Sequence, residues 1–105
     1  MKLGLSSTCH LFFSTLSNPT RLAIVELLRK GPLNVAEISD ELAQEQSMVS
    51  HNLKPLTRCG FVTVERRWRE RVYRLNKDTM EPLFDLVKTH AERYCPRKGK
   101  CLERM

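Results

Sequence analysis

Long apolar stretches are missing from this chain of 105 residues. A helix that crosses a bilayer needs about 20 consecutive apolar residues, so we expect no membrane partner. The first seven residues carry one charge and no apolar signal core, which favours a cytoplasmic location. Glycine (4 residues) and proline (5 residues) are too few for a collagen-like or low-complexity chain. The length and composition therefore indicate one small globular domain.

Cysteine is scarce as well. The chain has four, Cys9, Cys59, Cys95 and Cys101. This number is too small for a disulfide scaffold, so reduced thiols are expected. The Cys-x-x-Cys pair of thiol oxidoreductases is absent, so we do not expect an enzyme, and a thiol redox protein is kept only as an alternative.

Acidic residues are nearly absent from two basic segments. Residues 66–74 hold five arginines and one glutamate, and residues 93–104 hold five cations and one glutamate. The whole chain has a net charge of +6. Cations gathered in this way favour a polyanion such as nucleic acid as the partner. The alternative is a charge excess that only keeps the protein soluble.

Apolar residues recur with helical spacing in five segments. Asn18 before Pro19 is typical of a helix start, and Asn34 followed by Glu37 forms a variant capping box. Pro55 lies inside the fourth segment and predicts a kink or a loosened turn there. The expected helices span about residues 7–16, 19–30, 35–43, 47–58 and 78–94.

Two short β-branched segments, residues 61–64 and 72–75, predict strands that residues 65–71 join as a hairpin. The order α-α-α-α-β-β-α predicts a mainly α (α+β) winged helix-turn-helix. The first and last helices carry apolar stripes that the core helices need not cover. We therefore expect a homodimer through these two helices; the alternative is that both pack on their own core. Residues 1–94 would form the DNA-binding and dimerisation domain, and residues 95–105 a basic tail.

Five motifs together resemble the ArsR/SmtB family of dimeric bacterial and archaeal repressors. They occur in the family's order and cover roughly residues 8 to 94. They are LSNPTRL (16–22), VAEI (35–38), QSMVSHNL (46–53), CGFV (59–62) and VYRL (72–75).

The resemblance implies that the fourth helix is the recognition helix, which enters the DNA major groove. Its side chains suit base edges, because Gln and Asn pair with adenine and Lys with guanine or phosphate. Two alternatives stay open: Met48 packs in the core, and Asn52 bonds to the local backbone. The candidate contacts are Gln46, Ser47, Met48, Ser50, His51, Asn52 and Lys54.

The hairpin is the second expected DNA contact, through Arg66, Arg67, Arg69 and Arg71. These arginines suit phosphates or a narrow minor groove. The alternative is a solvated hairpin. The family usually has a glycine in this turn, and its absence here predicts a longer or more open turn around Trp68.

The effector sites known for the family do not match this sequence. A thiolate site in the third helix would need cysteines where Asn34 and Ala36 stand. A zinc site along the last helix is matched only by His90. Cys59 is expected to be a small core residue, since its would-be partner is Pro55.

Cys95 and Cys101 lie among cations that favour the thiolate form. With Cys9 on the first helix, they are candidate ligands for a soft metal ion or arsenite, or targets of an oxidant. The prediction is a sequence-specific repressor that binds double-stranded DNA as a homodimer and is released by such an effector. The alternatives are a regulator without sensing and a protein-interaction module of the same fold.

Overall fold

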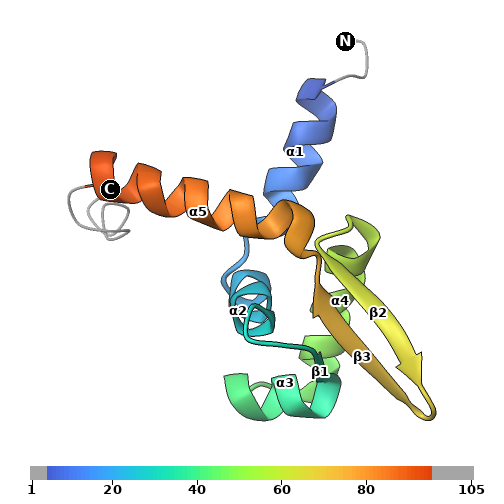
Figure 1. Ribbon diagram of the computed structural model, residues 1–105. Helices are drawn as coiled ribbons and strands as arrows, with labels where there is room; N and C mark the ends of the chain where they lie inside the picture. Colours follow the sequence, from blue (N-terminus) through green and yellow to red (C-terminus); the bar gives the residue numbers. More distant parts are fainter. Residues whose placement is uncertain (1–4, 96–105) are drawn as a thin grey trace.

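The computed structural model describes the backbone of residues 5–95 and the side chains of residues 10–95. Five helices and three strands form a mainly helical body with a projecting hairpin (Figure 1). The winged helix-turn-helix fold expected from the sequence is confirmed. The elements are α1 (Leu5–Leu16), α2 (Pro19–Leu28), β1 (Leu33–Asn34), α3 (Val35–Leu42), α4 (Gln46–Arg58), β2 (Val62–Arg67), β3 (Glu70–Leu75) and α5 (Lys77–Tyr94).

The predicted helix starts are confirmed. The Oδ1 of Asn18 accepts a hydrogen bond of 3.1 Å from the backbone N–H of Arg21, and Pro19 opens α2. At α3, Asn34 and Glu37 each accept a bond from the other's backbone N–H, at 2.8 and 2.9 Å. These bonds satisfy amides that have no partner inside the helix.

The sheet has one strand more than expected. The two residues of β1 pair antiparallel with β3, with Leu33 opposite Tyr73, so the strand order is β1-β3-β2. A strand of two residues is too short to show the alternation of side chains that predicts strands. Its pairing attaches the hairpin to the segment before α3.

The core lies where α2, α3 and α4 meet the base of the hairpin. All three helices and both long strands contribute side chains, and α5 adds one in its first turn. The fully buried side chains are Ile24, Val25, Leu28, Ile38, Val49, Leu53, Leu56, Phe61, Val62 and Met80.

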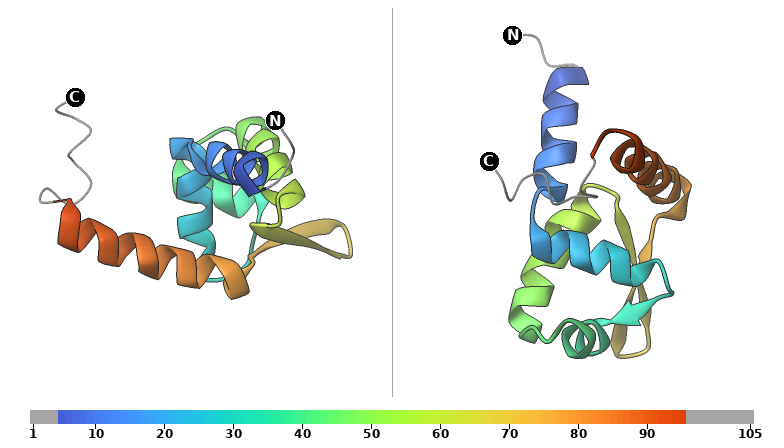
Figure 2. Two further views of the ribbon diagram at one scale, coloured as in Figure 1. Left: turned by 90° about the horizontal axis from the view of Figure 1, so that it is seen from above. Right: turned by 90° about the vertical axis from the view of Figure 1, so that its left-hand side faces the viewer.

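Helices α1 and α5 extend away from this core (Figures 1 and 2). Phe12 of α1 packs edge-on against Phe61, with ring centroids 4.8 Å apart. Arg29, which follows the last residue of α2, holds the base of α5: it pairs with Glu81 at 3.3 Å and lies 4.8 Å over the ring of Phe84. The hydrogen bond to Glu81 raises the pKa of Arg29.

Apolar side chains on both outer helices face solvent in the single chain. Phe13 is 59% exposed and Leu86 is 66% exposed. Leu11, Val87 and Tyr94 are also exposed. The core therefore leaves the outer parts of both stripes uncovered, whereas Leu16 and Met80 at their inner ends are buried.

The turn of the hairpin differs from the prediction. β2 and β3 pair as far as Arg67 and Glu70, so only Trp68 and Arg69 form the turn. Trp68 supplies the positive φ of 59° that a tight turn requires and that glycine usually provides. The expected longer or more open turn is therefore wrong.

Candidate nucleic-acid interface

Helix α4 has one buried and one exposed face. Val49, Leu53 and Leu56 pack into the core, and α4 continues through Pro55 to Arg58. The opposite face is polar and open to solvent, except that Ser50 is half-buried. The sequence-predicted contacts on this side are Gln46, Ser47, Met48, Ser50, His51 and Lys54.

Asn52 does not belong to this exposed face. Its side chain is 5% exposed, and its Nδ2 donates to the carbonyl of Met48 at 3.0 Å. Its Oδ1 accepts from the Nε of Arg21, also at 3.0 Å. Both polar atoms are used inside the protein, so the prediction of a DNA contact for Asn52 is wrong and the backbone-bond alternative is correct.

Arg21 joins three helices through this contact. Its Nη1 also donates to the carbonyl of Thr15 near the end of α1, at 3.3 Å. Through these bonds, α2 holds the last turn of α1 and the middle of α4 together. The helical spacing could have predicted that Asn52 is buried. Together with Val49, Leu53 and Leu56 it follows the i, i+3, i+4, i+7 pattern of the apolar face.

The long strands of the hairpin, called the wing below (residues 62–75), sort their charges by face. Side chains opposite each other across an antiparallel pair share a face. Arg66 lies opposite Arg71, on the face of Val64 and Tyr73, which is turned toward α4. We call this the inner face.

The outer face of the wing carries both of its carboxylates. Glu65 pairs with Arg67 and with Arg74, each at 3.5 Å. Glu70 accepts a hydrogen bond of 3.3 Å from Asn34 at the start of α3. The positive charges of two arginines and the negative charges of two glutamates thus cancel on this face.

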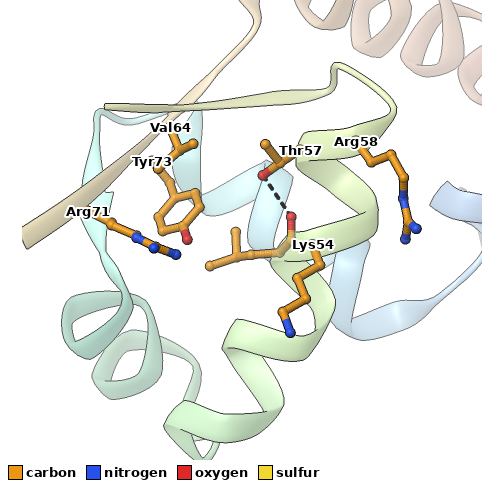
Figure 3. A pocket seen from close by; sticks show the side chains of 7 residues that line it. Lys54, Thr57, Arg58, Val64, Arg71 and Tyr73 are labelled. Carbon is orange, nitrogen blue, oxygen red and sulfur yellow. Dashed lines mark hydrogen bonds between the residues drawn. The ribbon is translucent and has the colours of Figure 1, made fainter. Parts of the chain in front are cut away.

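A groove of about 400 Å³ separates α4 from the wing (Figure 3). Lys54 and Arg58 come from α4, and Arg71 and Tyr73 from β3. The hydroxyl of Thr57 donates to the carbonyl of Leu53 at 2.8 Å, so the other donors in the groove are the cations and the hydroxyl of Tyr73. Arg58 was not among the residues predicted from the sequence, although it lies eleven residues after Ser47, on the same side of the helix.

The turn places Trp68 and the sequence-predicted contact Arg69 at the tip of the wing. Trp68 is 88% exposed, and the guanidinium of Arg69 lies 5.5 Å from the centre of its ring. The tip therefore presents a cation and an aromatic surface to whatever the wing meets.

Only part of the candidate thiol set lies among the described side chains. Cys95 is half-buried just after α5, and the backbone of Cys9 lies in α1. Cys101 lies outside the described residues. Cys59 is exposed at the end of α4, with its Sγ 3.4 Å from the hydroxyl of Thr15, so its predicted place in the core is wrong.

His90 is exposed on α5 and lies beside Tyr94, with ring centroids 5.0 Å apart. Within the described part of the chain, no three His, Cys, Asp or Glu side chains gather in a metal-binding group. No helix there is long and apolar enough to cross a membrane.

Two relatives of known sequence are similar to much of the chain. The transcriptional regulator NmtR of Mycobacterium tuberculosis is 39% identical over 77 residues, which cover 73% of this chain and 64% of that protein. The arsenical resistance operon repressor of Staphylococcus xylosus is 29% identical over 70% of this chain and 74% of its own length. The chain thus spans less than two thirds of NmtR.

Two solved structures share the fold. Rv0081 of Mycobacterium tuberculosis is 30% identical, with a TM-score of 0.78 over 91% of this chain and 98% of that one. The homodimeric winged helix-turn-helix DNA-binding domain of Mb0332 from Mycobacterium bovis is 26% identical. Its TM-score is 0.77 over 87% of this chain and 84% of that one.

A family model described as "Bacterial regulatory protein, arsR family" matches residues 18–64. This range begins at the cap of α2, contains the whole helix-turn-helix and ends in β2. The match, the relatives and the fold agree with the motifs in the sequence. The chain belongs to the ArsR/SmtB family of winged helix-turn-helix transcriptional regulators.

Proposed function

We propose that the protein is a transcriptional repressor that binds a palindromic DNA operator as a homodimer. The observation that carries this proposal is the exposed polar face of α4, which follows α3 in a helix-turn-helix. A helix about 10–12 Å across fits the major groove of B-DNA. Binding to DNA agrees with the expected location of the protein in the cytoplasm.

The two contact regions have different tasks in this proposal. The exposed side chains of α4, such as Ser47 and His51, read base edges. The wing arginines Arg66, Arg67, Arg69 and Arg71 hold phosphates or enter the minor groove. Met48 is 47% exposed, so it is available for contact with an apolar base edge.

Dimerisation is supported by the exposed apolar side chains of α1 and α5. A chain of this size gains stability by covering such stripes, and a second copy covers them symmetrically. The Mb0332 domain, of similar fold, is homodimeric. Two recognition helices related in this way would meet half-sites about 34 Å apart, or a multiple of that distance.

Selection of bound fragments from a random DNA pool tests the proposal, together with sedimentation of the free protein. We expect an imperfect palindrome and a dimer at micromolar concentration. His51→Ala and Ser47→Ala should narrow the affinity gap between the selected site and random DNA. A monomer that binds a single half-site, or no enrichment at all, would contradict the proposal.

Thiol-dependent release from DNA is the second part of the proposed function. The arsenical resistance operon repressor among the relatives favours it, and Cys95 follows the helix expected at the dimer interface. Cys95, Cys101 and Cys9 would respond to a soft metal ion, arsenite or an oxidant. The described residues alone do not form a metal site, so this part depends on Cys101 and on the side chain of Cys9.

Operator affinity of the wild type and of a Cys95→Ser, Cys101→Ser double variant tests the release. Each protein is measured reduced, oxidised, and with zinc, cadmium or arsenite. We expect at least one condition to weaken DNA binding by the wild type but not by the double variant. If the wild type has the same operator affinity in every condition, the alternative holds that the repressor does not respond to an effector.

A further inference from the structure

Two arginines attach the outer helices to the two ends of α2. Arg29, which follows the last residue of α2, holds α5 through Glu81. Arg21, in the first turn of α2, holds α1 through the carbonyl of Thr15. The outer helices leave the body in different directions from these points (Figure 1). Of the two arginines, Arg21 is the one whose printed bonds within the described residues also reach α4.

The bonds of Arg21 continue into the first turn of the recognition helix. Its Nε donates to the Oδ1 of Asn52 at 3.0 Å, and the Nδ2 of Asn52 donates to the carbonyl of Met48 at 3.0 Å. Met48 lies in the first turn of α4, and its side chain is exposed. Hydrogen bonds therefore run without a gap from the last turn of α1 to the first turn of α4.

Each group in this series of bonds is held at more than one place. The backbone N–H of Arg21 donates to the cap residue Asn18, which fixes Arg21 at the start of α2. Asn52 is buried and uses both of its polar side-chain atoms. Thr15 is buried too, and its hydroxyl lies 3.4 Å from the Sγ of Cys59 at the end of α4. Helix α1 thus meets α4 at two points, and turning one helix against the other would break directional bonds.

The chemistry of this contact exceeds what holding the helices together requires. Arg21 is half-buried and has no carboxylate partner among the described side chains, so neutral oxygens alone meet its charge. Apolar side chains would hold the helices without removing a guanidinium from water. Hydrogen bonds differ from apolar contacts because they depend on direction and favour a single arrangement. The contact therefore indicates a need for a defined angle between α1 and α4.

We propose that Arg21 is a positioning residue that couples α1, at the dimer interface, to the base-reading face of α4 through Thr15 and Asn52. This inference rests on the proposed binding of a palindromic operator by a homodimer. The distance and angle between the two recognition helices then follow the arrangement of the two α1 helices. Each base pair inserted between the half-sites moves one of them by about 3.4 Å along the DNA and by about 35° around it. The bonds of Arg21 prevent α4 from following that movement.

Operators that differ only in the spacing of their half-sites measure this coupling. Affinity is compared for a selected palindrome and for the same palindrome with two base pairs inserted at its centre, and the ratio is the spacing preference. We expect this preference to fall about tenfold in Arg21→Ala and in Asn52→Ala, a coupling typical of residues in one hydrogen-bond network. A loosened α4 reaches the displaced half-site more easily. Affinity for DNA with a single half-site should stay close to that of the wild type.

Asn34→Ala is the matched control, since it removes the same kind of side chain from the cap of α3, outside the contact of α1 with α4. It should destabilise the protein and leave the spacing preference unchanged. Circular dichroism confirms that each variant is folded. If Arg21→Ala does not fold, Arg21→Lys takes its place, because an ammonium lacks the fork that lets a guanidinium reach both acceptors.

The double variant Arg21→Ala, Asn52→Ala tests whether the two residues act as one link. Its spacing preference should fall no further than that of either single variant. Falls that add in the double variant would overturn the inference, since the residues would then act separately.

An unchanged spacing preference in Arg21→Ala and Asn52→Ala would also overturn the inference and leave the proposed function standing. Arg21 would then serve the stability of the fold alone. A wild type that binds both spacings equally, or that binds no DNA, would overturn the proposed palindromic operator and this inference together.

Discussion

The two ends of the chain differ from its middle in how they use apolar side chains. Residues 19–80 bury Ile24, Leu53 and Met80 completely, whereas Phe13 on α1 and Leu86 on α5 are more than half exposed. The middle of the chain forms a core whose apolar side chains are buried. The outer helices have exposed apolar side chains that a single chain does not cover. Changes in the two regions should therefore affect different equilibria, folding in the middle and association at the ends.

The largest effect is expected in the core. Leu56 is fully buried on α4, and Leu56→Ala would leave a cavity beneath the recognition helix. Such truncations cost about 2–5 kcal/mol, a large part of the stability of a small domain. Denaturant unfolding should show the loss at any protein concentration. A loss that disappeared at high concentration would place Leu56 in the interface instead.

A change on α5 should act on association. Leu86→Glu places a charge in the exposed apolar stripe, and the dimer dissociation constant should rise by about thirtyfold, or ~2 kcal/mol. Sedimentation equilibrium measures this change. Lys88→Glu is the control, since it alters a polar position of the same helix. A similar rise for both variants would show that net charge, not the stripe, controls association.

Two neighbours on α4 should separate stability from recognition. Asn52→Ala removes the acceptor of Arg21 and should lower the free energy of unfolding by about 1–3 kcal/mol. His51→Ala alters an exposed side chain and should change stability by less than about 0.5 kcal/mol. The preference of His51→Ala for the operator over random DNA should still fall. Urea unfolding together with operator and random-DNA affinities gives both quantities, and a destabilised His51→Ala would contradict the assignment.

The smallest effect is expected at the tip of the wing. Trp68 has a positive φ, so Trp68→Gly should be more stable than Trp68→Ala by about 1 kcal/mol. Both variants lose the contact with Arg69, so their difference isolates the backbone conformation. Thermal unfolding measures it. Equal stabilities would mean that the turn relaxes when the indole is removed.

Sequence patterns predicted most of this fold, because local chemistry and periodicity determine it. The capping box of Asn34 and Glu37 and the apolar spacing of α4 indicate helices before any tertiary contact is known. Strand β1 was missed since its two residues form a strand only through pairing with β3. The tight turn was missed since Trp68 adopts a conformation that its side chain disfavours, and the pairing of the strands maintains it.

The site was predicted less completely than the fold. Exposure of Ser47 and His51 follows from the helical period, and the same period would have assigned Asn52 to the buried face. The cross-strand ion pair on the wing depends on register: Glu65 meets Arg74 only because Val64 lies opposite Tyr73. A shift of one residue would move the arginines of the shifted strand to the other face.

Trp68 is the only tryptophan of the chain, and it stands almost fully in solvent at the tip of the wing. Its fluorescence therefore reports on the surroundings of that tip and hardly on the core. Unfolding should leave the emission nearly unchanged, because the indole is hydrated in both states. An operator that reaches the wing should alter it strongly, so the molecule carries its own optical signal for contact at this one place.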